Sequence, residues 1–253
     1  MAAWSEEFIG AAGEPPDPGT WIAEVGGGGW GDAQLQTYTQ PPANAQLTGD
    51  GRLRITARAD EDDPGRITSA RLTTRGRLTF RHGSVAARIK VPAGPGVWPA
   101  LWMLGADIDA VGWPACGEID VMEVVGGDPT AVHGTVHLPG HAGVGQGIGC
   151  RHDARAVLAE DFHVYSVDWD ADRVAWRLDG REYFRVTRAD LGGSWPFDRP
   201  FFLILNLAVG GRWPGNALAP ESLPAEMLVD WIRFTGTGTE VTARPSRGSR
   251  PRG

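Results

Sequence analysis

Hydrophobic and polar residues alternate along this chain in short segments, with glycine, proline and aspartate between them. A period of two is typical of strands that bury one face. We therefore expect strands in the alternating segments 52–59, 70–74, 84–91, 130–138 and 226–236. The chain shows no convincing long amphipathic helix pattern. Many short strands joined by Gly/Pro-rich segments indicate an all-β sandwich or barrel.

Two further segments give sharper local predictions. In residues 173–187, RVAWRLDGREYFRVT, the pair Asp179-Gly180 separates two alternating runs. That arrangement is a strong signal for a two-residue hairpin turn. Residues 201–211, FFLILNLAVGG, form a continuous apolar run. Such a run is typical of a strand that is buried on both faces.

The strand pattern extends from residue 4 to residue 236 without a repeat or a domain break, which predicts one domain over that range. Two glycine-rich segments, 24–34 and 138–150, are predicted to be loops, and the first could wrap around a ligand. Residues 237–253 are rich in Arg, Pro, Gly and Ser, so we expect a disordered C-terminal tail.

Composition excludes some classes of partner. The 253 residues carry a formal net charge of -7, which argues against the phosphate neutralisation that nucleic-acid binding requires. No segment approaches the run of about 18 apolar residues expected of a membrane span. The N-terminal residues MAAWSEEFIG lack the basic region and apolar core of a signal peptide, so we expect either that the chain stays inside the cell or that a signal has been removed. We expect neither nucleic acid nor a membrane as a partner.

Tryptophan and cysteine each leave two interpretations open. The chain has eleven Trp against three Tyr. Indole rings stack on the apolar faces of sugars, but they also fill large β cores. The two cysteines, Cys116 and Cys150, could form one disulfide or none, and they do not decide the compartment.

Three carboxylates stand close together in residues 117–124, GEIDVMEV. In a regular strand, Glu118 and Asp120 share one face and Glu123 points to the other. The simplest interpretation is a strand with its acids in water. However, one extra residue at Val121-Met122, a β-bulge, would return Glu123 to the face of the other two acids. Paired carboxyls across a scissile bond are what glycoside hydrolysis needs, and close acids separate their pKa values.

The segment Gly117–Glu123 resembles the active-site motif of glycoside hydrolase family 16. Further segments, among them GVWPALWMLG, VHGTVHLPG and LILNLAVGGRWPG, resemble the bacterial laminarinase branch in the same order, over about residues 6–236. The resemblance implies a β-jelly-roll sandwich of two antiparallel sheets with a substrate cleft on the concave face. It also implies a retaining endo-β-1,3-glucanase that hydrolyses its substrate by double displacement.

The resemblance assigns roles to the three acids. Glu118 matches the nucleophile, Glu123 matches the general acid/base, and Asp120 matches the carboxylate that assists between them. Met122 makes this the bulged version of the motif, which is similar to that of laminarinases, agarases and carrageenases. Lichenases resemble the version without the bulge.

Further positions match residues that bind the sugar chain: Trp98, Trp102, Trp113, His137, Asn206, Trp213, Arg71 and Asn44. Four of them have ordinary alternatives: Trp98 or Trp102 could belong to the core, His137 could be an ordinary hydrogen-bonded polar residue, and Arg71 could form a plain surface ion pair. His133 lies on the same predicted strand face as His137, but it receives no role. One departure stands out: where the family often has Asn-Glu-Leu-Gln, this chain has Ala33 and Gln34 in the first two positions. A carboxylate contact from this loop is therefore in doubt.

Many members of the family hold a structural calcium ion on the convex side. The matching residues here would be Glu7, the backbone near Gly51, and Asp230. No cofactor is expected for catalysis itself. Family habit places such enzymes outside the cell, a cytoplasmic location remains open, and we expect a monomer. Two alternatives remain: a non-catalytic β-glucan-binding protein, and a hydrolase of the same family that acts on mixed-linkage glucan or on a galactan.

Overall fold

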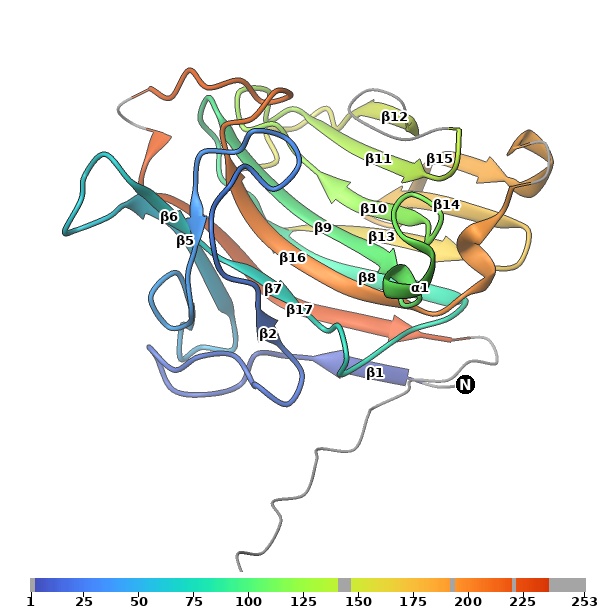
Figure 1. The fold of residues 1–253 in the computed structure, drawn as a ribbon, viewed down its shortest axis with the longest axis horizontal. Helices are drawn as coiled ribbons and strands as arrows, with labels where there is room; N and C mark the ends of the chain where they lie inside the picture. Colours follow the sequence, from blue (N-terminus) through green and yellow to red (C-terminus); the bar gives the residue numbers. More distant parts are fainter. Residues whose placement is uncertain (1–2, 141–146, 192–193, 220–221, 237–253) are drawn as a thin grey trace, which may run out of the picture.

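The computed structural model describes residues 3–140, 147–191, 194–219 and 222–236, which fold into two sheets. Figure 1 shows the curved strands of one sheet in front of the other. The all-β prediction is confirmed. The C-terminal tail predicted over 237–253, and residues 141–146 of the second glycine-rich loop, lie outside the described residues.

The larger sheet has ten strands. Its strands, in spatial order, are β15 (Arg181–Thr187), β14 (Arg173–Leu178), β13 (His163–Trp169), β8 (Gly83–Lys90), β17 (Ala225–Thr235), β5 (Leu53–Ala59), β6 (Ile67–Ser69) and β3 (Thr37–Tyr38), with β1 (Ala3–Glu6) beside β17 and β4 (Ala45–Leu47) beside β5. Among the described strands, the pairs are antiparallel except for β3 with β6, which is parallel.

The smaller sheet has seven strands and faces the viewer in Figure 1. Its strands, in spatial order, are β12 (Ile148–Asp153), β11 (Ala131–His137), β10 (Glu118–Glu123), β9 (Val97–Gly105), β16 (Phe201–Val209), β7 (Arg71–Thr73) and β2 (Ile22–Ala23). Helical structure is limited to α1 (Ile108–Val111), η1 (Arg188–Leu191) and η2 (Pro196–Asp198) in the described part of the chain. No helix among these is long and apolar enough to cross a bilayer.

Both sharp local predictions are confirmed. Asp179 and Gly180 connect β14 to β15 with φ angles of 49° and 78°. Positive φ at both positions is what a type I′ hairpin turn requires, and glycine adopts it without steric cost. All nine residues of β16 are buried, as the continuous apolar run predicts.

The core fills the space between the sheets, because each strand directs alternate side chains inward. In β8, for example, Val85, Ala87 and Ile89 are all fully buried. Trp169 and Trp176 are among the largest side chains of this core. Part of the high tryptophan content therefore serves the core.

Strand β10 carries the irregularity that its sequence predicts. Against β9, Asp120 pairs with Trp102 and Met122 pairs with Leu101, so Val121 is the extra residue. Against β11, the register also shifts between Asp120 and Glu123. Val121 and Met122 are both buried in the core, which is the local effect of a bulge. Glu123 is thereby returned to the face that carries Glu118 and Asp120.

Candidate active site

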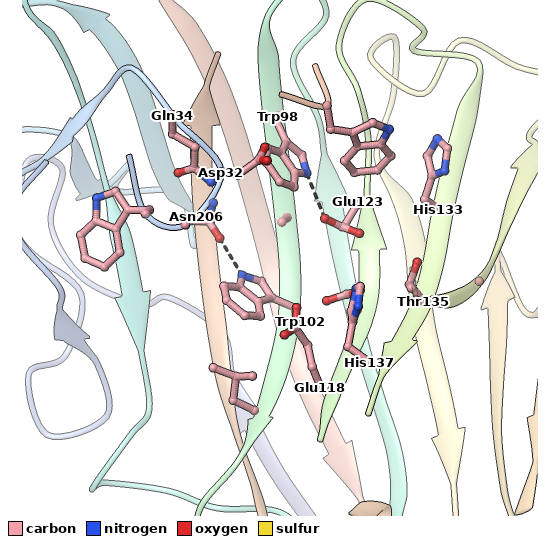
Figure 2. A pocket seen from close by; sticks show the side chains of 18 of the residues that line it. Asp32, Gln34, Trp98, Trp102, Glu118, Glu123, His133, Thr135, His137 and Asn206 are labelled. Atoms are coloured by element: carbon pink, nitrogen blue, oxygen red, sulfur yellow. Dashed lines mark hydrogen bonds and ion pairs between the residues drawn. The ribbon is translucent and has the colours of Figure 1, made fainter. Parts of the chain in front are cut away.

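A cleft of about 730 Å³ lies on the outer face of the seven-stranded sheet. Most of its residues come from six adjacent strands, β7, β16, β9, β10, β11 and β12, and the rest come from α1, from the segments before β10 and β12, and from the loops around residues 30–34 and 212–213. Glu118, Asp120 and Glu123 all line it, and Figure 2 shows the two glutamates with the flanking indole rings. The bulge therefore gathers three acids from one strand into one cavity.

Glu118 lies at one end of this group of acids. Its Oε2 accepts a hydrogen bond of 2.6 Å from the indole N–H of Trp113. His137, its cross-strand neighbour on β11, has Nε2 3.4 Å from Oδ2 of Asp120. Side-chain ligand atoms of Glu118, Asp120 and His137 lie within 4.8 Å of one another. Two carboxylates and an imidazole thus share a very small volume.

Glu123 lies at the other end, among aromatic rings. Its Oε1 accepts a hydrogen bond of 3.0 Å from the indole N–H of Trp98. The ring of Trp98 meets the ring of Trp213 edge-on at 5.2 Å, and Trp213 meets His133 in the same way at 4.8 Å. These contacts fix the orientation of the carboxyl group without supplying a positive charge.

The two glutamates have unlike electrostatic surroundings. Burial, followed by the charge of Asp120, raises the pKa of Glu118 to about 8, although His137 and the Trp113 hydrogen bond act in the opposite direction. Burial and the charges of Asp120 and Glu118 raise the pKa of Glu123 well above its ordinary value, and only the Trp98 hydrogen bond is recorded as opposing this rise. Burial lowers the pKa of His137, but the hydrogen bond and charge of Asp120 outweigh it and raise the pKa overall. Both carboxyls therefore hold a proton more tightly than usual, and His137 opposes this at Glu118 alone, so Glu118 loses its proton more readily than Glu123.

On the β9, β16 and β7 side of β10, the residues of the cleft wall are linked by hydrogen bonds and cation–π contacts. Asn206 is buried, its Oδ1 accepts a 2.7 Å bond from the Trp102 indole, and its Nδ2 donates to the Tyr38 hydroxyl at 3.2 Å. The guanidinium of Arg71 lies between the rings of Trp30 and Trp102, 4.9 and 4.7 Å from their centroids. Aromatic faces next to fixed polar groups are what a sugar chain needs for stacking and hydrogen bonding.

Comparison with known proteins decides the family. The family model "Glycosyl hydrolases family 16" matches residues 33–233. The chain belongs to glycoside hydrolase family 16. This confirms the resemblance of the motif around Glu118.

Individual relatives cover most of the family 16 domain. A protein named β-glucanase from Rhodothermus marinus is 40% identical over 243 residues, which is 91% of this chain and 83% of that protein. The laminarinase catalytic domain of Thermotoga maritima superposes with a TM-score of 0.85 at 43% identity, covering 93% of this chain and 97% of that one. An endo-β-1,3-glucanase from Pyrococcus furiosus superposes with a TM-score of 0.84 at 41% identity, and the match covers 95% of this chain and 94% of that one. The predicted jelly-roll sandwich is confirmed by these structural neighbours.

The structure brings together most of the sugar-binding residues predicted from the family resemblance. Those that line the cleft are Trp98, Trp102, Trp113, His137, Asn206, Trp213 and Arg71. Trp98 and Trp102 both line it, and Trp102 also packs against a buried cluster that includes Leu104 and Phe202. Arg71 does form an ion pair, with Glu24, but its side chain is only 12% exposed and lies inside the cleft wall. Trp213 contacts the rings of Trp98 and His133.

The prediction for Asn44 is wrong. This residue is buried outside the cleft, just before β4, and its amide is fully engaged. Its Nδ2 donates to the carbonyl of Thr56 at 2.7 Å, and its Oδ1 accepts from the Thr39 hydroxyl at 2.6 Å. A third bond joins its Nδ2 to Thr68 Oγ1 at 3.2 Å. Both amide N–H donors are used within the protein and the residue is only 2% exposed, so the side chain has no donor left for a sugar.

The residues named for calcium do not fit that ion. Both carboxylate oxygens of Glu7 pair with Arg233, at 3.0 and 3.1 Å. The carboxylate of Asp230 pairs with Arg88 at 2.6 Å and lies 3.8 Å from Arg52. Calcium requires six to eight oxygen ligands around it, and guanidinium groups here occupy the side chains that would supply them. The Gly51 backbone lies near Glu7, but it adds no carboxylate.

We therefore expect chelation to leave the stability of this protein unchanged. The melting temperature should be the same in EDTA and in excess CaCl₂, because ion pairs with arginine already neutralise Glu7 and Asp230. Differential scanning calorimetry in both buffers measures this directly. A melting temperature that falls in EDTA and recovers in CaCl₂ would show that calcium displaces the arginines from Glu7 and Asp230, and would contradict this prediction.

Several cleft residues were not assigned from the sequence: Trp30, Asp32, Gln34, His133, Thr135 and Arg212. Three of them come from the glycine-rich loop 24–34, which was predicted to reach a ligand, but loop side chains have no period from which to assign them. His133 shares the strand parity of His137, and that signal could have identified it. The doubt about a carboxylate from this loop was misplaced, because Asp32 supplies one. Cys116 and Cys150 are free thiols.

Proposed function

We propose that this family 16 enzyme is a retaining endo-β-1,3-glucanase of the laminarinase type. The single observation that carries the proposal is the bulge in β10, which places Glu118, Asp120 and Glu123 on one face inside a cleft walled by tryptophans. The names of the similar proteins, laminarinase and endo-β-1,3-glucanase among them, support the substrate class.

In the proposed reaction, Glu118 attacks the anomeric carbon while Glu123 gives its proton to the departing glycosidic oxygen. A glycosyl ester on Glu118 results. Glu123, now ionised, takes a proton from water, and the oxygen of that water displaces Glu118 from the sugar. His137, which lies 3.4 Å from Asp120, favours the charge on Glu118, and the two indole N–H groups hold both carboxyls in place.

The asymmetry of the site supports this division of roles. The imidazole of His137 and the Trp113 N–H both favour the ionised form of Glu118. Glu123 faces three negative charges, of Asp120, Glu118 and Asp32, which favour its protonated form. A nucleophile must be ionised and an acid must carry its proton. The pKa of both carboxyls is raised, but His137 lowers only that of Glu118, and this difference supports Glu118 as the nucleophile and Glu123 as the acid.

We expect laminarin to be cleaved to short oligosaccharides, while lichenan, agarose and carrageenan are cleaved more slowly or not at all. Parallel incubations with product analysis test this, and NMR of the first products should show the β-anomer, as double displacement requires. Cleavage of a galactan alone would contradict the proposed substrate but leave the proposed mechanism intact. Binding of laminarin with no release of reducing sugar would instead support a glucan-binding protein. The formal net charge of -7 on the chain disfavours sulfated substrates.

A further inference from the structure

Asp32 lies where two loops meet at the rim of the cleft. Its backbone N–H donates to the carbonyl of Gly29 at 2.9 Å, and its own carbonyl accepts from the N–H of Arg212 at 3.0 Å. The glycine-rich loop is thereby joined to the loop that carries Trp213. Gly211 leaves room for the Asp32 carboxylate, since a Cβ on that glycine would lie 2.8 Å from Oδ2. The backbone thus fixes where this side chain lies.

The carboxylate of Asp32 is buried without a partner. The residue is only 6% exposed, and neither of its oxygens has a hydrogen-bond partner in the described part of the chain. The charged neighbours are already engaged: Arg71 pairs with Glu24, and Arg212 directs its guanidinium toward the carbonyl of Gly31. A buried carboxylate without donors destabilises the fold. Such a group in a cleft wall indicates that a ligand supplies the missing donors.

The surroundings also define the chemistry of that ligand. Asp32 lines the same cleft as the acids of β10, and its charge contributes to the electrostatic field at Glu123. A negative group placed directly against the Asp32 carboxylate would be repelled, so a phosphate or sulfate ester does not fit at this position. A neutral hydroxyl fits, because a carboxylate only accepts hydrogen bonds and each of its oxygens can take one. Figure 2 shows Asp32 on the Trp98 and Gln34 side of Glu123, opposite His133.

We propose that Asp32 is a substrate-binding residue whose carboxylate oxygens accept hydrogen bonds from hydroxyl groups of the sugar unit bound on the β9–β16 side of Glu123. This assignment rests on the proposed glucanase function. It explains why the chain keeps an unpaired acid in a position that costs stability. Hydrogen bonds to a charged group form only when the sugar is present, so they add to binding without serving the folded state alone.

Asp32→Leu removes both acceptors, and Asp32→Asn keeps one of them without the charge. On laminarin we expect Asp32→Leu to lower kcat/KM about 10- to 100-fold, and Asp32→Asn to lower it less. Melting temperatures of both variants should equal or exceed that of the wild type, because an unpaired buried charge is lost. Asp230→Asn is the matched control: it breaks an ion pair outside the cleft, so it should lower the melting temperature and leave kcat/KM unchanged.

Two results would overturn the assignment. One is an unchanged kcat/KM in Asp32→Leu while the wild type cleaves laminarin. The other is a fall of melting temperature in both Asp32 variants that parallels their loss of activity, which would make the role structural. Failure of the proposed function gives a different result, since the wild type itself would then leave laminarin intact. In that case, calorimetric titration of laminari-oligosaccharides into wild type and Asp32→Leu still tests whether Asp32 binds the sugar. Equal affinities of the two proteins would reject the assignment.

Discussion

Replacing Glu118 by glutamine should reduce laminarin hydrolysis by at least about a thousandfold and leave glucan binding intact. Glutamine has the same shape, and its amide oxygen can still accept the Trp113 hydrogen bond. It cannot form the glycosyl ester, because an amide oxygen is a far weaker nucleophile than a carboxylate. Reducing-sugar release and calorimetric binding of laminari-oligosaccharides measure the two effects separately. Normal turnover by the variant would remove Glu118 from the mechanism.

The pH dependence of the melting temperature of Glu118→Gln shows whether the variant is folded and whether Glu118 titrates as described. The pKa of Glu118 is raised in the folded state from 4.5 to about 8. Its carboxyl therefore binds a proton more tightly when the protein is folded, and the stability gained from it below pH 4.5 is lost as the pH rises toward 8. Glutamine does not titrate, so the melting temperature of the variant relative to wild type should rise across this window. Glu61→Gln is the matched control, since Glu61 is exposed and lies outside the cleft.

Replacing Glu123 by alanine should lower hydrolysis of laminarin about 10²- to 10⁴-fold, the usual contribution of a general acid. A glucoside with a dinitrophenolate leaving group should lose far less in its first step, because that group departs without a proton. Burial and three neighbouring carboxylates raise the pKa of Glu123 well above its ordinary value, which favours the protonated form that a general acid needs, and the Trp98 hydrogen bond orients the carboxyl group. Steady-state and burst kinetics on both substrates give the comparison.

Azide distinguishes the two glutamates further. In Glu123→Ala, azide can occupy the vacated space and break the ester to Glu118, giving a glycosyl azide of β configuration and restoring turnover on the aryl glucoside. Equal losses on both substrates, with no rescue, would contradict an acid/base role for Glu123.

Strand parity made the centre of this site predictable. Alternation is a local rule, so the mismatch between Glu118, Asp120 and Glu123 could be interpreted from six residues, and the register of β10 confirms the bulge. The hairpin at Asp179-Gly180 was predictable for the same reason, because its turn chemistry lies entirely in adjacent residues.

Residues whose roles depend on distant partners were not predictable in this way. Asn44 was assigned to the cleft, but its amide is satisfied by Thr56 and Thr68, more than ten positions away in sequence. Asp230 was assigned to calcium, but Arg88 comes to it from the neighbouring strand β8. Asp32 lies in a loop without periodicity, and its position depends on contact with Arg212. In each case, the three-dimensional packing selects the partner, and no local pattern encodes it.

The order of strands in the seven-stranded sheet sets a length scale for the substrate. Cleft residues lie on six adjacent strands from β7 to β12, and five inter-strand spacings amount to about 24 Å. A single sugar ring is much shorter, so a polymer crossing the strands occupies several positions at once. Three strands, β9, β16 and β7, lie on one side of the acids of β10, and two, β11 and β12, lie on the other. We therefore expect the sheet to bind a longer stretch of polymer on the β9–β7 side of the cleaved bond than on the β11–β12 side.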